Sequence, residues 1–360
     1  MRSTRPSGSA ASTPSGPSRP TCPTSPRSSP PRVVGQARPR LTVVGGALDP
    51  TVARGRNEVR RVLADLGPGA RVVVGVSGGA DSLALAAVTA FVAAKASFAL
   101  QAVVVDHGLQ DGSGQVAANA VEQLERLGVS ATAVRVEVGA DGGPEAAARN
   151  ARLAALAASD ADAVLLAHTL DDQAETVLLG LGRGSGPRSI AGMAEIDGRW
   201  RRPFLALRRS DAEQICRASG LDWWVDPHNS DPRFRRSRLR RDVMPLLEDV
   251  LGGGVAPALA RTAHQLQSDS SALDELAADV AAPDDVATLQ SLHPAVRSRV
   301  LRRLALSAGA DASALSSAHL AELDRLVTDW RGQQRVELPG GICVKRAGPS
   351  LLCSATPVTQ

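Results

Sequence analysis

Residues 71–82 read RVVVGVSGGADS, and this stretch decides the fold prediction. Branched apolar residues in its first half are typical of a buried strand, and the apolar stretch at 82–95 has the composition of a helix. Small residues and hydroxyls between a strand and a helix indicate an anion-binding loop, because the first amides of a helix have no partner inside it. We therefore expect a strand, an anion-binding loop and a helix in succession.

The same alternation of strand and helix patterns continues beyond this stretch. Further strands are predicted at 99–105, 131–138 and 162–167, and further helices at 53–66, 114–127, 144–158 and 171–181. Apolar strands that alternate with helices predict an α/β fold with a doubly wound, mostly parallel sheet covered on both faces. Ligands of such a sheet lie at the carboxyl ends of its strands.

Composition divides the chain into three parts. Residues 1–48 contain no Asp or Glu and are rich in Ser, Pro, Arg and Thr, so we expect a disordered tail. Its frequent prolines oppose the amphipathic helix of a transit peptide and favour a dispensable segment. Residues 49–250 contain the predicted sheet, and after three glycines, residues 255–360 are predicted to form a smaller, mainly helical domain.

The predicted C-terminal domain has a pattern of its own. Helical patterns fall near 255–281, 289–307 and 316–330, and two short strand patterns follow at 335–338 and 342–346. The Pro-Gly-Gly between these two strands is typical of a turn. We therefore expect the domain to end in a hairpin.

Bulk composition excludes several classes of protein. The four cysteines form no C-x-x-C pair and have no zinc spacing, so a reducing compartment, the cytoplasm, is favoured over a disulfide scaffold. The apolar runs are far shorter than a membrane span, and no membrane partner is expected. The net charge of +4 is mild, and lysine occurs only at positions 95 and 345. Oligomeric state is left open, a homodimer included.

The glycine-rich loop has three interpretations. Residues 75–79 match the nucleophile elbow G-x-S-x-G, with Ser77 as the nucleophile of a hydrolase. A structural alternative is a tight turn in which Ser82 caps the helix. In the third interpretation, residues 77–82 form a pyrophosphate loop, S-G-G-x-D-S. This interpretation is favoured because it also uses Asp81 and Ser82, which the elbow leaves without a role.

The loop at 77–82 resembles that of the PP-loop ATP pyrophosphatases, whose fold is adenine nucleotide alpha hydrolase-like. Further stretches resemble tRNA(Ile)-lysidine synthase in order and spacing. They are VVVDHGL at 103–109, EAAARNAR at 145–152, LLAHTLDDQAETVLL at 165–179, RGSGPRSIAGM at 183–193 and WWVDPHNSDPRFRRSRLRRDVMPLL at 223–247. Residues 335–353 resemble the substrate-binding domain of that family more weakly.

The resemblance implies an ATP-dependent ligase. ATP, with Mg²⁺, would adenylate the C2 oxygen of the wobble cytidine in an isoleucine tRNA that has a CAU anticodon. The ε-amine of free L-lysine would then displace AMP and give lysidine. Residues 49–250 would be the PP-loop catalytic domain, and residues 255–360 the tRNA substrate-binding domain.

The resemblance also implies roles for the matching residues. The catalytic set comprises Asp81, Arg149, His168 and Asp172. The residues implied in ATP binding are Ser77, Gly78, Gly79, Ala80, Asp81, Ser82 and His107, with Asp81 also the Mg²⁺ ligand. The lysine ammonium groups would be bound by Asp172 and Glu175.

Spacing supports the acidic residues independently of the resemblance. From His168, the carboxylates of Asp171, Asp172 and Glu175 follow at i+3, i+4 and i+7, which is one face of a helix at a strand's carboxyl end. The structural alternative is that Asp171 or Asp172 only caps the helix start. Capping does not account for Glu175.

Two other residues also have structural alternatives. His107 follows a predicted strand in D-H-G at 106–108, where the family often has His-His-Gly, and a structural histidine is the alternative. Arg149 lies one helical turn after Glu145, so an exposed i,i+4 ion pair is the alternative to a place near the substrate or the adenylate.

Residues 233–241, RFRRSRLRR, form a run of one charge sign. A solvated helix face is the structural alternative, but arginine forks suit phosphates. The residues predicted to bind tRNA are Arg233, Arg235, Arg236, Arg238, Arg240 and Arg241. Ser237 and His228 depart from the Asn and the Ser or Thr common in the family. Trp223 and Trp224 either stack on bases or pack in the core.

Two other functions stay open at this point. A PP-loop tRNA thiolase is disfavoured because sulfur transfer there usually needs paired cysteines or a cluster. A tRNA-binding adaptor without catalysis is disfavoured because Ser77, Asp81, Asp172 and Glu175 are all in place. An ATP–pyrophosphate assay with and without tRNA distinguishes an enzyme from an adaptor.

Overall fold

The structure is a computed structural model that describes residues 48–108, 110, 112–139, 143–183, 186–226 and 231–355. The predicted tail lies outside these residues except for Leu48, and so does His228.

A six-stranded sheet forms the first of these regions. Its strands are β1 (Arg71–Val76), β2 (Ala99–Asp106), β3 (Ser130–Arg135), β4 (Ala163–Leu165), β5 (Ile196–Asp197) and β6 (Trp200–Arg201). Their order is β3-β2-β1-β4-β6-β5, and only the β5–β6 pair is antiparallel. The predicted α/β fold with a mostly parallel sheet is confirmed. The two-residue strands β5 and β6 were not predicted, because two residues show no alternation.

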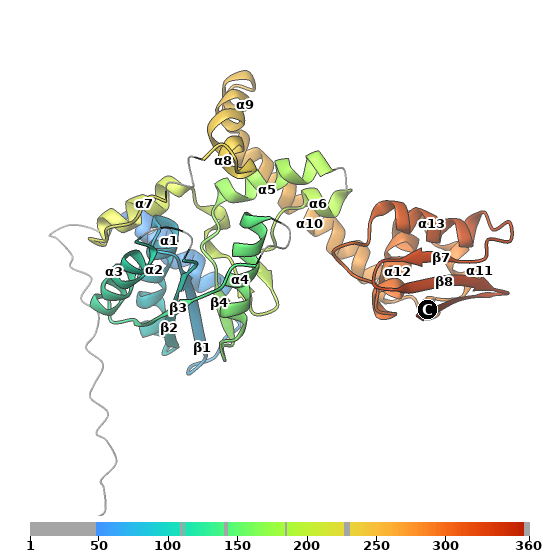
Figure 1. Cartoon of the computed structure of the whole chain (residues 1–360), viewed down its shortest axis with the longest axis horizontal. Coiled ribbons are helices and arrows are strands. Elements are labelled where there is room, and N and C mark those ends of the chain that lie inside the picture. Colours follow the sequence, from blue (N-terminus) through green and yellow to red (C-terminus); the bar gives the residue numbers. More distant parts are fainter. Residues whose placement is uncertain are drawn as a thin grey trace, which may run out of the picture. The chain divides into compact units, whose positions relative to one another are not determined.

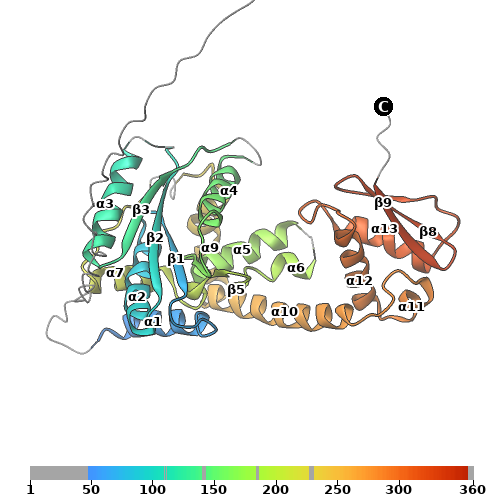
Figure 2. The same cartoon turned by 90° about the horizontal axis from the view of Figure 1, so that it is seen from below.

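Helices cover both faces of this sheet (Figure 1, Figure 2). On one face a core joins β1 and β2 to α1 (Pro50–Val62), α2 (Ala80–Ala96), α3 (Ser113–Arg126) and α7 (Arg209–Ala218). On the other face α4 (Pro144–Ala157) packs Leu153 and Leu156 against Val73, Val103 and Val164. After β3 the chain crosses, through α4 on the other face, to β4 on the far side of β1. The strand order therefore reverses between β1 and β4. Ligands of such sheets bind at this topological switch point, outside the carboxyl ends of the strands.

The starts of the helices follow from their sequences. Asp49 accepts hydrogen bonds from the N–H groups of Thr51 and Val52, so α1 begins three residues earlier than predicted. α2 likewise begins at Ala80, with Gly79 as its N-cap residue. The alternative in which Ser82 caps this helix is therefore wrong, because Ser82 lies inside the first turn.

Short elements connect the sheet to the C-terminal domain. They are α5 (Leu170–Arg183), α6 (Pro187–Ile190), the 3₁₀ turn η1 (Pro203–Ala206), α8 (Arg235–Arg238), the π-helical turn η3 (Leu239–Val243) and α9 (Met244–Val250). In the described part of the chain no single helix is long and apolar enough to cross a membrane. The pair Arg235–Val250 and Val255–Ala278, bent by 93°, meets that test by length and composition only.

The C-terminal region contains α10 (Val255–Ala278), α11 (Val286–Ser291), α12 (Pro294–Ser307) and α13 (Ser317–Thr328). An antiparallel sheet follows, with β7 (Val336–Leu338), β8 (Ile342–Ala347) and β9 (Ser350–Ala355). The helical stretch predicted near 289–307 is present but is divided between α11 and α12, since Pro294 starts a new helix and disfavours helical backbone before it. The predicted hairpin is a three-stranded sheet, because Ser350–Ala355 also pairs with β8.

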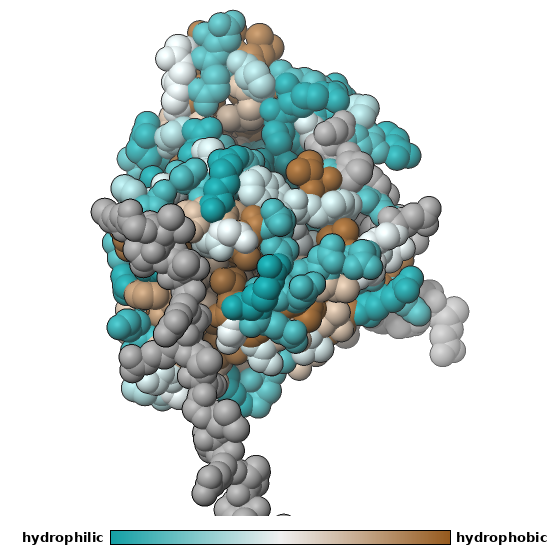
Figure 3. Space-filling view, turned by 90° about the vertical axis from the view of Figure 1, so that its left-hand side faces the viewer, coloured by the Kyte–Doolittle hydropathy of each residue, from teal (hydrophilic) through white to brown (hydrophobic). Residues whose placement is uncertain are grey.

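The surface seen in Figure 3 is mainly hydrophilic, and apolar residues lie there in small groups on the part that is not covered by grey atoms. Apolar side chains are instead concentrated in three buried clusters, two on the faces of the large sheet and one between the C-terminal helices and β7–β9. The two regions therefore each have a hydrophobic core.

α5 and α6 pack so closely that one glycine is required. A Cβ atom on Gly180 would lie 1.8 Å from the carbonyl oxygen of Ser189, and backbone atoms cannot yield as a side chain can. Gly180→Ala should therefore destabilise the protein by about 1–3 kcal/mol or more and lower its melting temperature by several degrees. Calorimetry measures this.

Gly182→Ala is the matched control on the same helix. A Cβ atom on Gly182 would meet nothing within 4 Å among the described residues. Because alanine favours helix, this variant should melt at the same temperature as the parent or slightly higher. Equal melting temperatures for the two variants would contradict the close packing of α5 on α6.

Candidate active site

The loop after β1 is closed by its own serines. The Ser77 N–H donates to Ser82 Oγ at 3.1 Å, and Ser82 Oγ donates to the Gly79 carbonyl at 2.9 Å. Gly78 has a φ of +81°, and a Cβ atom there would lie 2.9 Å from Val116 Cγ1, so only glycine fits. No described side chain caps α2 at Gly79. The first amides of α2 are thus left for an anion.

A row of carboxylates begins α5, one strand away from this loop. The N–H and the hydroxyl of Thr169 donate to Asp172 Oδ2 at 2.8 and 2.9 Å, so Asp172 does cap its helix. Its other oxygen, Oδ1, faces Arg209. Glu175 lies one turn further and is only 1% exposed. Capping therefore explains one oxygen of Asp172 and leaves the other, with Glu175, for a second role.

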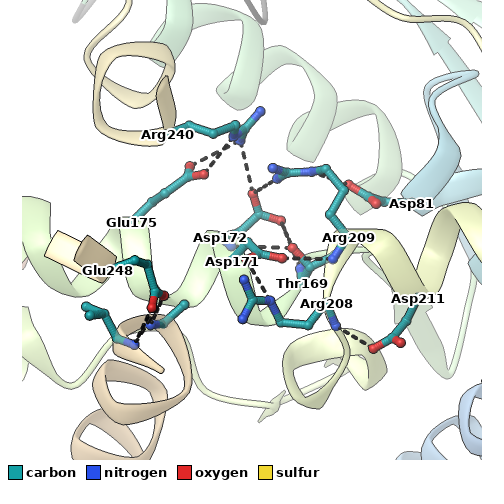
Figure 4. Close-up of polar contacts among 12 residues, drawn as sticks. Asp81, Thr169, Asp171, Asp172, Glu175, Arg208, Arg209, Asp211, Arg240 and Glu248 are labelled. Carbon is teal, nitrogen blue, oxygen red and sulfur yellow. Dashed lines mark hydrogen bonds and ion pairs between the residues drawn. The ribbon is translucent and has the colours of Figure 1, made fainter. Parts of the chain in front are cut away.

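Two arginines join these carboxylates into one network (Figure 4). Arg209 lies between Asp81 and Asp172, with its Nε 3.4 Å from Asp81 Oδ2 and its Nη2 2.9 Å from Asp172 Oδ1. Arg240 binds Glu175 through two nitrogens, at 2.8 and 3.2 Å, and lies 3.6 Å from Asp172 Oδ1. Three carboxylates, one on α2 and two on α5, thus face the same two guanidinium groups.

Burial and these charges set the protonation of the site. Burial raises the pKa of Asp81 to about 6, although the nearby Arg209 opposes the rise. Burial also raises the pKa of Glu175, against the hydrogen bonds from Arg240. The pKa of Asp172 is lowered despite its burial, because Arg209 and Thr169 stabilise the carboxylate. Burial and Arg152 lower the pKa of His168 to about 3, so its imidazole is neutral near pH 7.

A cavity of about 220 Å³ opens beside the carboxylates. Its lining residues are Asp171, Glu175, Arg208, Arg209, Arg240, Met244, Pro245 and Glu248. Glu248 has two functions here, since its carboxylate also accepts hydrogen bonds from the N–H groups of Val255 and Ala256 at the start of α10. A larger cavity, about 290 Å³, is lined only by α12 and α13 residues and contains none of these groups. Acidic and basic walls in a small volume suit a zwitterion.

Comparisons with known proteins concern both regions of the chain. A PP-loop domain model matches residues 53–247, and a model described as the TilS substrate binding domain matches residues 285–349. The tRNA(Ile)-lysidine synthase of Thermobifida fusca is 50% identical over 85% of this chain and 98% of its own length. Those of Streptomyces coelicolor and Mycobacterium tuberculosis are 51% and 52% identical, over 78% and 75% of this chain and 84% and 83% of their own lengths.

The chain belongs to the tRNA(Ile)-lysidine synthase family. It is therefore a ligase that modifies tRNA and uses ATP. Among solved structures, a U34-tRNA thiolase from Methanococcus maripaludis is similar over 60% of this chain and 79% of its own, with a TM-score of 0.51 and 19% identity. That likeness concerns the fold alone.

The sequence pattern did not indicate every residue of this candidate site. Arg209, Arg208 and Glu248 lie in or beside the network, but none was singled out. Arg209 begins α7, 128 residues from Asp81, so only the folded chain brings the two together. Two consecutive arginines, Arg208 and Arg209, at a helix start could have indicated a partner for the carboxylates. Arginine is common throughout this sequence, so the pair did not stand out.

The segment before the arginine run is tied to the loop. The Trp224 N–H donates to the Gly78 carbonyl at 3.0 Å, and Asp222 and Gln123 exchange two hydrogen bonds of 2.8 Å. Trp223 packs against the core beside α7, so the core alternative is confirmed for this residue.

His107 follows β2, and its Nδ1 is buried without a hydrogen-bond partner among the described residues. Arg149 Nη1 lies 3.3 Å from His168 Nε2. The side chain of Glu145 lies outside the described part of the chain, so the alternative of an i,i+4 ion pair stays untested.

The arginine run does not form a single surface. The side chains of Arg233 and Arg238 are 82% and 67% exposed, and Arg235 is exposed as well. Arg240 instead points inward to Glu175. Members of the run differ in this way because a helical turn points successive side chains in different directions. The predicted contact of the six arginines with tRNA stays a prediction.

The exposed arginines should contribute to tRNA affinity through charge alone. In the variant with both Arg235→Ala and Arg238→Ala, the slope of log K against log salt concentration should fall by about 1.4–1.8, since each phosphate contact contributes about 0.7–0.9. Filter binding at several salt concentrations measures the slope. Arg126→Ala, which removes an exposed arginine from α3, should leave it unchanged. An unaltered slope in the double variant would reject phosphate contact.

Proposed function

We propose that this site forms lysidine in two steps. In this proposal Asp81 serves the nucleotide, and Asp172 and Glu175 bind lysine. In the first step the C2 oxygen of the wobble cytidine attacks the α-phosphorus of ATP, and pyrophosphate leaves. In the second step the ε-amine of lysine attacks C2, the C2–O bond breaks, and AMP leaves with that oxygen. The observation that carries the proposal is the shared network beside the anion-binding loop.

The nucleotide half of the site comprises the loop and Asp81. Ser77, Gly78, Gly79, Ala80 and Ser82 offer amides and hydroxyls for pyrophosphate oxygens, and His107 directly follows β2, the strand beside β1. Asp81 Oδ1 is buried and has no hydrogen-bond partner among the described residues. One carboxylate with phosphate oxygens and water is a usual Mg²⁺ environment. Asp81 would therefore hold Mg²⁺, which neutralises the charge that develops on the leaving pyrophosphate.

The lysine half comprises Asp172, Glu175 and the cavity beside them. The Arg240 guanidinium now occupies the position on Glu175 that a lysine ammonium group would take. Lysine would replace this contact with one of its own, so the number of charged pairs is conserved. The neutral imidazole of His168 does not repel the ammonium group. Orientation of the amine toward C2 would then supply much of the rate.

We assign tRNA binding to the exposed part of the arginine run and to residues 255–360. The family match at 285–349 supports a substrate-binding role for the second region. Residues 49–250 would be the catalytic domain, with the boundary near the three glycines at 252–254, between α9 and α10. We place the reaction in the cytoplasm, where free lysine, ATP and tRNA occur together.

The direct test is a reaction with ATP, lysine and unmodified isoleucine tRNA, followed by mass analysis of the nucleosides. We expect lysidine, AMP and pyrophosphate in equal amounts. A methionine tRNA with the same anticodon is the control, and it should stay unmodified. Hydrolysis of ATP without lysidine would contradict the proposal. Binding of tRNA with no pyrophosphate release would indicate an adaptor.

A further inference from the structure

The reaction proposed above gives no role to residues 186–193, although they belong to a stretch that resembles the family. This segment is tied to α5 near both ends of the helix. Ser189 Oγ donates to the Gly180 carbonyl at 2.9 Å. The Met193 N–H donates to Gln173 Oε1 at 2.7 Å, and Gln173 Nε2 donates to the Met193 carbonyl at 2.9 Å. The helix that carries Asp172 and Glu175 is thus held by one short segment.

The contact at Gln173 is close and directional. The side chain of Gln173 is 5% exposed, and its amide binds the backbone of Met193 through both its oxygen and its nitrogen. Gly192 permits this approach, since its φ is +67° and a Cβ atom there would lie 2.7 Å from Gln173 Oε1. Two bonds from one amide must stay aligned together. They therefore fix the rotation of α5 about its axis, which apolar packing alone would not.

That rotation decides where the carboxylates of α5 point. Gln173 directly follows Asp172 and lies two residues before Glu175. A helix turns by about 100° per residue, so these side chains keep fixed directions relative to one another. Asp172 and Glu175 contact Arg209 and Arg240, whereas Gln173 contacts residues 186–193. Any turn of α5 that breaks the Gln173 contact would also move both carboxylates.

The segment is anchored a second time, by α10. Gln267 Nε2 donates to the carbonyls of Ala191 and Met193 at 2.6 and 2.9 Å, so Met193 accepts from two glutamines. α10 packs on both α5 and α6. Its first N–H groups are bound by Glu248, which also lines the cavity. α10 therefore supports the candidate site at its start and again in its middle.

We propose that Gln173 and Gln267 are positioning residues for lysine, which fix the direction of Asp172 and Glu175 through the backbone of Met193. The inference rests on the proposed function, in which these two carboxylates bind lysine. Neither glutamine is among the described residues that line the cavity, so both act through α5. Such support matters because a displacement of about 1 Å at a reacting group can cost about a hundredfold in rate.

The test compares the KM for lysine with adenylation in single-turnover reactions without lysine. Gln173→Met removes both bonds to Met193 and should raise the lysine KM by about tenfold, while adenylation stays within about twofold, since the loop at 77–82 belongs to another helix. Gln267→Met should raise the KM less, because the Gln173 contact remains. In the double variant the two effects should not add, since both glutamines act on Met193.

Two controls separate positioning from loss of stability. Gln265→Met removes an exposed glutamine from α10 and should match the parent. Gln123, which is 7% exposed, exchanges two hydrogen bonds of 2.8 Å with the backbone of Asp222, as Gln173 does with Met193. Gln123→Met and Gln173→Met should therefore lose melting temperature to a similar extent. Only Gln173→Met should raise the lysine KM.

Parental lysine KM values in Gln173→Met and Gln267→Met would overturn the inference. Equal rises in Gln123→Met and Gln173→Met would overturn it too, because lower stability would then explain both. If Gln173→Met does not fold, Gln267→Met decides, since its side chain is only partly buried. Calorimetry with free lysine gives a result that is independent of the reaction. Weaker lysine binding in the variants of a protein that makes no lysidine would support the positioning role and reject the proposed function.

Discussion

Asp81→Ala should cut both pyrophosphate release and lysidine formation by about a hundred- to a thousandfold, the loss typical for a fixed group that stabilises transition-state charge. Asp81 belongs to the loop at 77–82 and lies in the first turn of α2, and one of its oxygens has no protein partner among the described residues. Every later step depends on the nucleotide that it positions. Single-turnover reactions with labelled ATP, with and without lysine, measure the two activities separately.

Asp81→Asn and Asp65→Ala make this test specific. Asparagine keeps the shape of Asp81 and removes its charge, so Asp81→Asn should be nearly as inactive as Asp81→Ala. Asp65 also pairs with an arginine, Arg201, but neither residue belongs to the network that contains Asp81. Asp65→Ala should therefore retain activity. Near-normal pyrophosphate release in Asp81→Asn would show that the charge is not needed.

Glu175→Ala should raise the KM for lysine by about ten- to a hundredfold, because it removes a charge-assisted contact of about 1.5–3 kcal/mol. Adenylated tRNA should still form, and without its acceptor it should accumulate. Glu175 is buried and binds Arg240, which is 33% exposed and can turn to solvent when its partner is lost. The measurement is a lysine titration, together with single-turnover adenylation in the absence of lysine.

Glu58→Ala is the control for Glu175, since it removes another arginine-paired glutamate, on α1. Its lysine KM should equal that of the parent. If Glu175→Ala blocks adenylation as fully as Asp81→Ala does, Glu175 belongs to the nucleotide half of the site. The division of the carboxylates between the two substrates would then be wrong.

The parts of this fold that were predictable carry local signals. The strand, loop and helix at 71–96 were found from a run of branched residues, glycines and hydroxyls, which fix backbone geometry within a few residues. The start of α5 was predicted to within one residue for the same reason, since Asp171 and Asp172 lie in its first turn. β5 and β6 have too few residues to show the alternation of apolar and polar side chains that is typical of a strand. β9, which follows a turn after β8, was also not predicted.

The arginine pairs could not be predicted, because they depend on tertiary distance. Arg240 reaches Glu175 across 65 residues of sequence, and Arg209 reaches Asp172 across 37. A run of arginines indicates that its partners are negatively charged. It does not indicate which arginine points into the protein. The sequence therefore indicated both the acidic row and the basic run, and only the fold indicates that they meet.

The use of arginine throughout this network has a chemical consequence. An adenylated cytidine is an electrophile, and any protein amine within reach would compete with free lysine and leave the tRNA bound to the enzyme. Guanidinium groups stay protonated and are not nucleophilic near neutral pH. The only two lysines are Lys95, about 21 Å along α2 from Asp81, and Lys345, in β8. The pocket thus attracts anions without offering an internal amine that would quench the activated base.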